Sequence, residues 1–375
     1  MVSSASARNA SSHDELLASG IKAIANKGID RITVGDITKI SHHSRPTFYT
    51  YFGDMNGFLA ELWIHYGIEW LDSLVENSTD AMPISELNSA MLEVLLVSHR
   101  NAEIAEVLNP DIQNWWQSKT ANDPVKCVRL AWYLSVKLGT YLSIPIIPDA
   151  VAATPFLAFL RTMPDDILKH PGMQVLLDNP MPQQAELPGI EKAPEHVERQ
   201  FLASTIEVVA NSGVAATSMA RIARRARVST GTLYPRYKTT DAIIAASFDL
   251  AIRQIVDGNV KQLEQELGPE QYGSIVVAGF LESRKSWRNY RLEMYLESQH
   301  NPELAKHMFP GLEETRLILD GVLIEYGYSL GQRAALTQVM QNLAVGISML
   351  FNAGIPVDKL DHRIPPRYIS VMAPK

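Results

Sequence analysis

Residues 17–49 read LASGIKAIANKGIDRITVGDITKISHHSRPTFY, and residues 202–234 read LASTIEVVANSGVAATSMARIARRARVSTGTLY. Aligned without a gap at an offset of 185 residues, the two stretches share 11 identities in 33 positions. Ordinary composition would give about 2 identities. A period of this length is too long for a solenoid. The chain therefore contains one domain-sized unit twice, and the two-fold symmetry that most oligomers build from two chains is expected within one chain.

The bulk composition bounds the class of protein. A chain of 375 residues with 46% hydrophobic residues can hold two domains with a core each. A formal net charge of −7 argues against non-specific coating of nucleic acid, because an acidic surface repels phosphate. The single cysteine, Cys127, excludes a disulfide framework and a thiolate metal cluster within the chain. There is no signal-like apolar core at the start and no run of about 18 uncharged apolar residues, so we expect a soluble, cytoplasmic protein without a membrane partner.

The first copy predicts three helices and then a long one. The second helix is expected to begin near Thr33, where Thr33-x-x-Asp36 resembles a capping box. After a turn, Ser44 is expected to cap a third helix over about residues 45–52. Pro46 falls in the first turn of that helix, where proline is tolerated.

The second copy predicts the same plan. A short helix is expected over about residues 219–226, after a first helix that ends at a glycine. Ser229 is expected to cap a third helix that continues through Tyr237. A long helix is then expected over about residues 240–267.

We expect an all-α fold of two tandem units, each a three-helix head on a helical bundle. A proline-rich segment between the halves is read as a linker, because proline stiffens a chain and limits its reach. The predicted segments are a first head at 12–55, a first bundle at 56–178, the linker at 179–194, a second head at 195–240, a second bundle at 241–354 and an irregular tail at 355–375.

The last apolar helix of each half, about 125–143 and about 331–353, carries small residues that let two helices approach closely. These small residues are Ser135, Gly139, Ala344, Gly346 and Ser348. We expect the two helices to pack together inside one chain and to replace the usual interface between two chains. The protein is then an intramolecular pseudo-dimer and a monomer in solution.

Three helices with a tight turn between the second and third are the layout of a helix-turn-helix, whose third helix enters the DNA major groove. In the second copy the apolar residues expected at the helix crossing are Ile222, Ala223, Ala226, Val228 and Leu233. Residues 217–240 also carry six basic residues and no acid, whereas residues 31–53 carry a net charge of only +2. Basic residues strengthen DNA binding because each neutralised phosphate releases counterions.

The segment 217–237, TSMARIARRARVSTGTLYPRY, resembles the DNA-binding signature of TetR-type transcriptional regulators. The whole chain resembles the fused, double-TetR regulators, some of which control lipid or sterol operons. The resemblance implies an all-helical protein in which a three-helix head reads DNA. It also implies a C-terminal bundle that binds a small molecule and pairs with a second subunit.

The first copy departs from the family pattern. His42 and His43 stand where the family usually has glycine-valine, and Pro46 stands where it often has glycine. Met55 and Thr240 occupy the start of the fourth helix, where the family tends to have lysine. We therefore expect weaker phosphate anchoring than is usual in the family, especially by the first head.

By this resemblance, contact positions fall at the start of the second helix and along the third helix of each head. Arg45 is the candidate for bidentate guanine readout, which Thr230 cannot perform. The two heads should then prefer different half-sites, so the operator should not be a perfect palindrome. The predicted DNA-binding residues are Thr33, Ser44, Arg45, Pro46, Thr47, Tyr49 and Tyr51 in the first head and Ser218, Arg227, Ser229, Thr230, Gly231, Thr232, Tyr234, Arg236 and Lys238 in the second.

The bundles contain aromatic and methionine residues that could line an effector pocket. The candidates are Trp115, Trp116, Trp132 and Tyr133 in the first bundle and Trp287, Tyr290, Met294 and Met308 in the second. An aromatic and methionine stripe at helical spacing is more often core than pocket lining, so both interpretations stay open. The effector expected from the resemblance is a small apolar molecule, lipid-like in character.

No nucleotide-binding glycine loop, HExxH or GxSxG motif occurs, so no motif in the sequence indicates a catalytic site. Glu103 with Glu106 and Glu293 with Glu297 are expected to be surface charges rather than catalytic pairs. We expect no cofactor and no metal site. The sequence therefore predicts a DNA-binding transcriptional regulator, a repressor released by its effector. The alternative is a ligand-binding or protein-interaction scaffold whose degenerate heads do not bind DNA.

Overall fold

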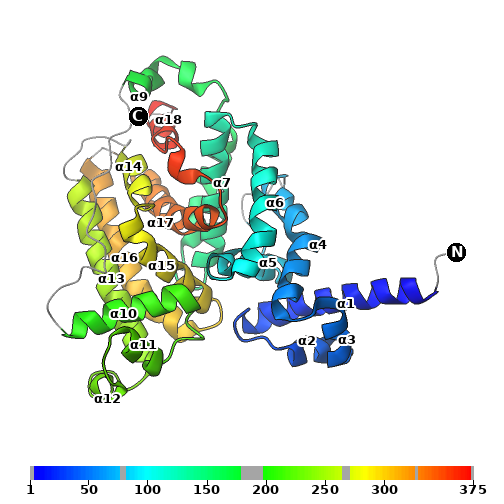
Figure 1. Ribbon diagram of the computed structural model, residues 1–375. Helices are drawn as coiled ribbons and strands as arrows, with labels where there is room; N and C mark the ends of the chain where they lie inside the picture. Colours follow the sequence, from blue (N-terminus) through cyan, green and yellow to red (C-terminus); the bar gives the residue numbers. More distant parts are fainter. Residues whose placement is uncertain (1–3, 77–81, 179–196, 264–270, 326–327, 373–375) are drawn as a thin grey trace. The chain divides into compact units, whose positions relative to one another are not determined.

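The computed structural model describes residues 4–76, 82–178, 197–263, 271–325 and 328–372, and the regular elements in these ranges are helices (Figure 1). The expected all-α class is therefore confirmed. The linker predicted at 179–194 lies outside the described residues, as does the end of the long helix predicted to reach 267.

Contacts divide the chain into two compact units. Unit 1 holds the residues up to 119 together with 352–355, and unit 2 holds 120–351 together with the residues from 356 onward. This division differs from the bundle predicted at 56–178, because the helices after residue 119 belong to unit 2. Residues 120–178, the last part of the first sequence half, thus belong to the compact unit that contains the second half.

Unit 1 carries the first head and the helices that support it (Figure 1). Its helices are α1 (Ser4–Lys27), α2 (Val34–Ser41), α3 (Arg45–Phe52), α4 (Met55–Glu76), α5 (Glu86–Val97) and α6 (Ala102–Thr120). Phe48, Phe52 and Phe58 form the aromatic centre of the head, with ring centroids 5.0 to 5.4 Å apart. Glu93 of α5 is buried and accepts a hydrogen bond from the backbone N–H of Ile29 at 2.7 Å, which fastens the head to the bundle.

Unit 2 carries the second head on a larger set of helices. These are α7 (Pro124–Ser143), α8 (Thr154–Arg161), α9 (Gln174–Asp178), α10 (Val197–Ser212), α11 (Met219–Arg225), α12 (Thr230–Leu233), α13 (Thr240–Leu263), α14 (Gln271–Ala278), α15 (Lys285–Ser298), α16 (Pro302–Glu325), α17 (Leu330–Asn352) and α18 (Ile364–Met372). Helix α10 packs on α13 and α15, as α1 packs on α4 and α5 in unit 1. The repeat therefore extends beyond the heads into the helices that support them.

Helices α7 and α17, both in unit 2, touch backbone to backbone. A Cβ atom on Gly139 would lie 1.9 Å from the carbonyl oxygen of Asn342, and one on Gly346 would lie 2.0 Å from that of Ser135. The contact residues rise along α7 while they fall along α17, so the two helices run antiparallel. The expected packing of the last apolar helix of one half on that of the other is thus observed.

A buried polar network fixes the register of these two helices. The Asn342 amide donates to Thr140 Oγ1 at 2.8 Å and to the Ala150 carbonyl at 3.1 Å. Its oxygen accepts from Gln338 Nε2 at 2.9 Å. Sliding α17 along α7 would leave the Asn342 amide without these two acceptors in the interior, where each missing partner costs about 1 to 3 kcal/mol. The network therefore specifies one alignment.

Helix α17 is long and apolar enough to meet the criterion for a membrane span, with a mean hydropathy of 1.3 over the best window. However, 67% of that window is buried inside the protein. Its apolar character is explained by its position between α7 and the surrounding helices of unit 2.

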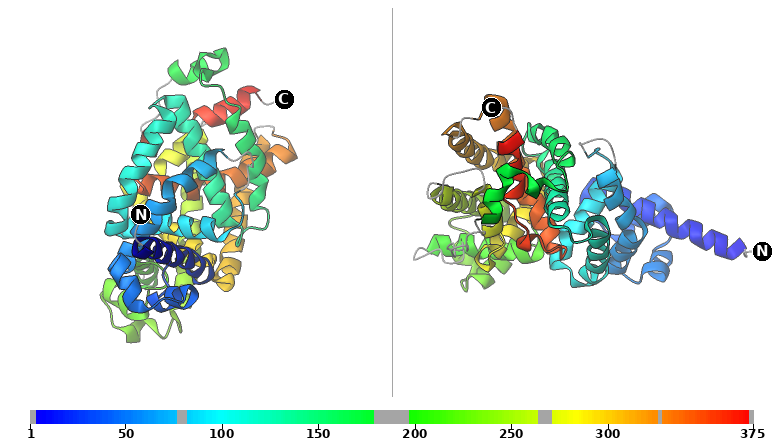
Figure 2. Two further views of the ribbon diagram at one scale, coloured as in Figure 1. Left: turned by 90° about the vertical axis from the view of Figure 1, so that its right-hand side faces the viewer. Right: turned by 90° about the horizontal axis from the view of Figure 1, so that it is seen from above.

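The irregular tail predicted at 355–375 is wrong for residues 364–372, which form α18. Pro365 and Pro366 do not prevent this helix, because both fall in its first turn, where a missing N–H leaves no bond unmade. Ile364 and Tyr368 are buried, and α18 packs on α7 and α14 (Figure 2). The C-terminal segment is thus part of the core of unit 2.

Candidate nucleic-acid interface and effector cavity

The start of α2 in the first head is capped as predicted. Thr33 Oγ1 accepts from the Asp36 backbone N–H at 3.2 Å, and the Asp36 carboxylate accepts from the Thr33 backbone N–H at 2.9 Å. Hydrogen bonds from Lys27 and then from Thr33 lower the pKa of Asp36 from 3.8 to about 2. Thr33 is exposed, so the residue that caps α2 also lies on the predicted contact surface.

Helix α3 of the first head is a complete two-turn recognition helix. Ser44 accepts from the Thr47 backbone N–H at 3.3 Å, and Pro46 sits in the first turn as expected. Phe48 is buried, which directs Tyr49 outward with 50% of its surface exposed. Exposed side chains therefore line one face of this helix.

Arg45, the candidate for guanine readout, lies over the start of α2. A Cβ on Gly35 would approach Arg45 Nη2 to 2.8 Å, so a larger residue at this position would displace the guanidinium. Arg45 itself is exposed. Tyr51 is less accessible, because its ring lies 5.7 Å edge-on from His13 and its side chain is half-buried.

The turn before α3 explains why glycine is usual there in the family. His42 has φ 58°, and Arg227 at the equivalent place in the second head has φ 55°. This left-handed region strains residues other than glycine. The next residue, His43, has its Nε2 atom 2.9 Å from Glu15 Oε2, which ties the turn to α1.

The third helix of the second head is shorter than predicted. Helix α12 covers only Thr230–Leu233, and the extension through Tyr237 is wrong. Pro235 is the reason, because it has no N–H to bond the carbonyl of Gly231 and its ring clashes with that turn. The predicted cap is wrong as well: Ser229 makes no side-chain cap bond, and its Oγ pairs with Thr232 Oγ1 at 3.0 Å.

The core of the second head nevertheless forms as expected. The buried cluster comprises Phe201, Leu202, Met219, Ile222, Ala223, Ala226, Leu233, Tyr237 and Ile243, with Val228 packed against it. Tyr237 donates from its hydroxyl to Glu198 at 2.9 Å, and burial raises the pKa of this tyrosine. The head thus holds its shape around a one-turn recognition helix.

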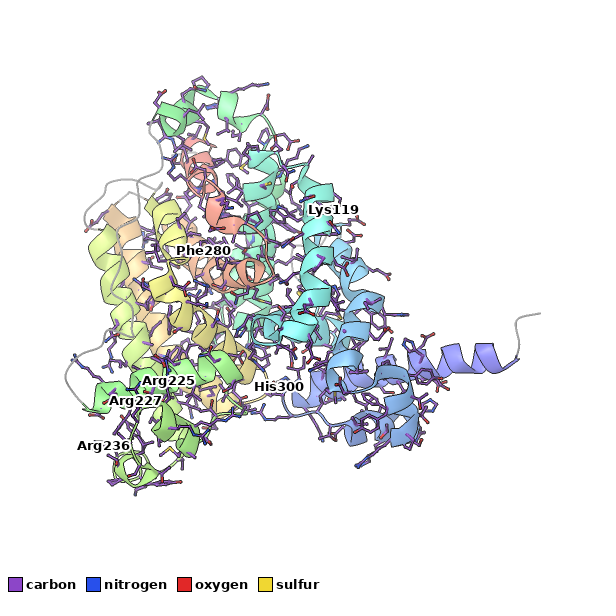
Figure 3. The ribbon with its side chains drawn as sticks, in the orientation of Figure 1. Lys119, Arg225, Arg227, Arg236, Phe280 and His300 are labelled. Atoms are coloured by element: carbon purple, nitrogen blue, oxygen red, sulfur yellow. The ribbon has the colours of Figure 1, made fainter. Side chains whose placement is uncertain are left out.

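The basic side chains of the second head are all exposed: Arg221, Arg224, Arg225, Arg227, Arg236 and Lys238. Figure 3 labels Arg225, Arg227 and Arg236, which lie around this head. Arg225 forms an ion pair with Glu207, while Arg236 lies over the Phe201 ring at 5.8 Å. Four of the arginines border a shallow hollow between α10 and α11. This head therefore presents a strongly positive surface.

The remaining predicted contact residues of the second head also reach the surface. Tyr234 is 52% exposed. Ser229, Thr230 and Gly231 are exposed, and Ser218 and Thr232 are half-buried. In the first head the predicted residues thus lie at the start of α2 and on α3 with its cap, whereas in the second head they also lie in the turn before α12 and in the segment after it.

Unit 2 contains a cavity of about 160 Å³ enclosed by α13, α14, α15, α16 and α17. Its walls are mainly apolar, with Ile252, Ile255 and Leu312 among them. Of the eight predicted pocket residues, only Trp287 lines it. The remaining seven are not part of its wall, which corrects the prediction.

The side chains of these seven residues are instead buried, and some of them form hydrogen bonds inside the protein. Tyr290, Met294 and Met308 are fully buried, and Tyr290 shares a hydrogen bond of 2.8 Å with Ser247. Trp132 donates to His362 Nδ1 at 2.9 Å. The others, which are buried in the described structure, are Trp115, Trp116 and Tyr133. Their burial favours the interpretation of the stripe as core, although Trp115 and Trp132 each border a smaller hollow.

The sequence prediction missed three arginines in the cavity wall, Arg284, Arg288 and Arg291. Arg284 ends the short helix before α15, and Arg288 and Arg291 lie on α15. Their spacing of four and then three residues is a signal in the sequence that the three share one helical face. Glu293 and Glu297, predicted as surface charges, are buried. Only Glu103 and Glu106 are exposed as expected.

Comparisons with known proteins match both heads. The sequence profile described as "Bacterial regulatory proteins, tetR family" matches residues 16–62 and residues 201–247. The chain is also similar to the fatty acid metabolism regulator protein of Bacillus subtilis (strain 168), with 24% identity over 136 residues. That alignment covers 36% of this chain and 69% of the relative. The profile matches coincide with the two copies of the repeat.

Proposed function

We propose that this chain, a tandem member of the tetR family of bacterial regulatory proteins, represses transcription by binding one operator with both heads. The match of both heads to this family supports a transcriptional regulator and not an enzyme. The observation that carries the proposal is the presence of two folded helix-turn-helix heads, each with exposed hydroxyl and basic side chains. Such groups bind phosphates and base edges.

The two heads are proposed to read different half-sites. The first offers Arg45 on a two-turn α3, and arginine suits bidentate bonds to guanine. The second offers Thr230 at the equivalent position, with basic residues around a one-turn α12. We infer that the first head contributes more to sequence choice, while the second contributes more to phosphate binding. The operator is then not a palindrome.

One chain is proposed to act where related proteins act as pairs. Support comes from the antiparallel contact of α7 with α17, because antiparallel packing of equivalent helices is what an isologous two-fold interface produces. In this arrangement one protein molecule occupies one operator, in the bacterial cytoplasm where that DNA lies.

An effector in the cavity of unit 2 is proposed to release the second head. Helix α13 joins the two sites, because Ile252 and Ile255 line the cavity while Ile243 belongs to the core of the head. A ligand that displaces the cavity end of α13 therefore moves the head end. Binding of effector and binding of operator are then coupled, each weakening the other by the same factor.

Electrophoretic mobility shift with the protein's own upstream DNA tests the proposal. The variant Thr232→Ala/Tyr234→Phe should weaken binding to every sequence and reduce its salt dependence, because both hydroxyls are proposed phosphate contacts. Arg253→Ala, an exposed arginine on α13 outside the head, is the matched control and should bind as the unaltered protein does. A protein that shifts no upstream fragment at low salt would be the scaffold of the alternative hypothesis.

A further inference from the structure

The cavity in unit 2 has charged residues in an otherwise apolar wall. Arg284 and Arg288 are 5% and 4% exposed, and Arg291 also lines the cavity. All three come from the start of α15 and the short helix before it. A cavity for a purely apolar molecule has no use for three cations, because buried charge is unfavourable without a partner.

The arginines are only partly satisfied by the protein. Arg288 Nη1 donates to the Gly279 carbonyl at 3.0 Å, and Arg291 Nη2 donates to Ser348 Oγ at 2.9 Å and to the Ala344 carbonyl. The Nε atoms of all three arginines are buried and have no hydrogen-bond partner. Among the described residues, no carboxylate lies within ion-pair distance of any of these guanidinium groups.

Aromatic rings hold two of the guanidinium groups in place. Arg288 lies 4.7 Å from the centroid of Phe351, and Arg291 lies 5.9 Å from that of Trp287. Burial lowers the pKa of all three arginines, that of Arg291 to about 10. They nevertheless remain cationic at neutral pH. The carboxylate of Glu282 also raises the pKa of Arg288 through its charge, but its ion pair is with Lys285 at 3.4 Å. The site is thus a fixed group of positive charges without an ion pair of its own.

We propose that the effector is an amphipathic anion, whose anionic headgroup binds Arg284, Arg288 and Arg291 and whose apolar part fills the rest of the cavity. This inference depends on the proposed function in taking the ligand to be the effector, and it names the class of that ligand. A guanidinium presents paired N–H donors that match a carboxylate or a phosphate.

The cavity volume bounds the apolar part of the ligand. An engineered protein cavity of about 150 Å³ accepts benzene, so a space of about 160 Å³ holds an apolar group of about six carbon atoms. Hexanoate, octanoate and benzoate meet both conditions. A longer chain fits only if the walls move apart.

Isothermal titration calorimetry on the full chain tests the class of ligand. The probes are hexanoate, octanoate, octyl phosphate, 1-octanol, octylamine and inorganic phosphate. We expect at least one of the chain anions to bind at least 30-fold more tightly than both 1-octanol and octylamine, and inorganic phosphate to bind more weakly than that anion. The carboxylate and phosphate arms identify the headgroup. Equal affinity for 1-octanol, or no binding of any chain anion, would overturn the proposal.

Variants separate a ligand site from a structural role. In Arg284→Met and Arg288→Met, we expect the affinity for the anion to fall at least tenfold, while the melting temperature of the ligand-free protein stays the same or rises. Removal of a buried charge without a partner explains that pattern. Arg253→Met, an exposed position on α13, is the control that should change neither quantity. A lower melting temperature with unchanged anion affinity would show that the arginines are structural and would contradict the proposal.

Electrophoretic mobility shift with the same proteins distinguishes a failure of the anionic effector from a failure of the proposed repressor function. Operator binding that persists while no anion binds would reject the anionic effector alone. Anion binding by a protein that shifts no operator would reject the repressor and leave the ligand site standing.

Discussion

The two heads come from one repeated sequence, yet a proline falls at a different place in each. Pro46 lies in the first turn of α3, so the first head has a helix of two turns. Pro235 follows the first turn of α12, where the first head has Thr50, and the helix stops at Leu233. The position of the proline within the helix, and not its presence, therefore decides the length of the recognition helix.

The number of basic residues differs between the heads in the opposite direction to the length of the recognition helix. The first head has a complete helix with few basic residues, while the second has a one-turn helix among six basic residues. Groups that specify sequence and groups that bind phosphate are therefore concentrated in different heads.

The largest effect is expected where the two halves of the sequence meet. Gly139→Ala places a Cβ 1.9 Å from a backbone oxygen of α17, so α7 and α17 must move apart. We expect the free energy of unfolding to fall by about 3 kcal/mol, as for a severely overpacked core. Chemical denaturation measures the decrease. Gly331→Ala, where a Cβ meets no atom within 4 Å, is the control and should not destabilise the protein.

Exchanging the proline positions comes next. Thr50→Pro removes a backbone bond inside α3 and should cost the first head about 3 kcal/mol, abolishing its half-site contribution. Thr50→Ser is the control, since serine can keep the bond that the Thr50 hydroxyl donates to the Pro46 carbonyl at 2.9 Å. Footprinting measures protection of each half-site. Loss of both half-sites together, without global unfolding, would contradict independent reading by the heads.

The charge difference predicts unequal salt dependence. Replacing Arg227, Arg236 and Lys238 by glutamine should lower the slope of log affinity against log salt by up to about 3, or about 0.9 for each phosphate that is no longer neutralised. Arg45→Gln should change that slope by about 1 at most while relaxing preference at one half-site. Titrations at several salt concentrations on matched and altered operators separate the two outcomes. Equal slopes for both variants would remove the proposed division of labour.

The smallest effect concerns acid. The folded-state pKa of Asp36 is about 2 and lies below its usual 3.8, so its capping contribution is complete above pH 4 and is lost as the pH falls from 4 towards 2. We expect α2 to lose about 1 kcal/mol, the usual value of a cap. Amide NMR of Thr33 follows the change, and Asp36→Asn should abolish it. The second head has Arg221 at the equivalent place, so the start of α11 should show no such titration.

Much of the fold followed from local patterns in the sequence. Thr33 and Ser44 cap α2 and α3 as predicted, because capping depends on residues three positions apart. The small residues Gly139 and Gly346 indicated the close approach of α7 and α17. Both features depend on local spacing or on residue size, which a sequence displays directly.

The failures have physical causes as well. The resemblance extends past Pro235 and so does not show that this proline ends α12, and prolines such as Pro365 and Pro366 break a helix or begin one according to their position in it. A stripe of aromatic residues does not predict the cavity, whose distinguishing feature is three arginines from α15 and the short helix before it. Which buried side chains border empty space depends on how helices far apart in sequence pack, and no local pattern contains that information.

The central claim is that one chain with two unequal heads occupies one operator. The mass of the protein–DNA complex on a short operator fragment, measured by sedimentation velocity, tests this most directly. We predict a complex that contains one chain of 41.7 kDa per duplex, with both half-sites protected. A complex that always contains two chains, with no one-chain species at any protein concentration, would contradict the account.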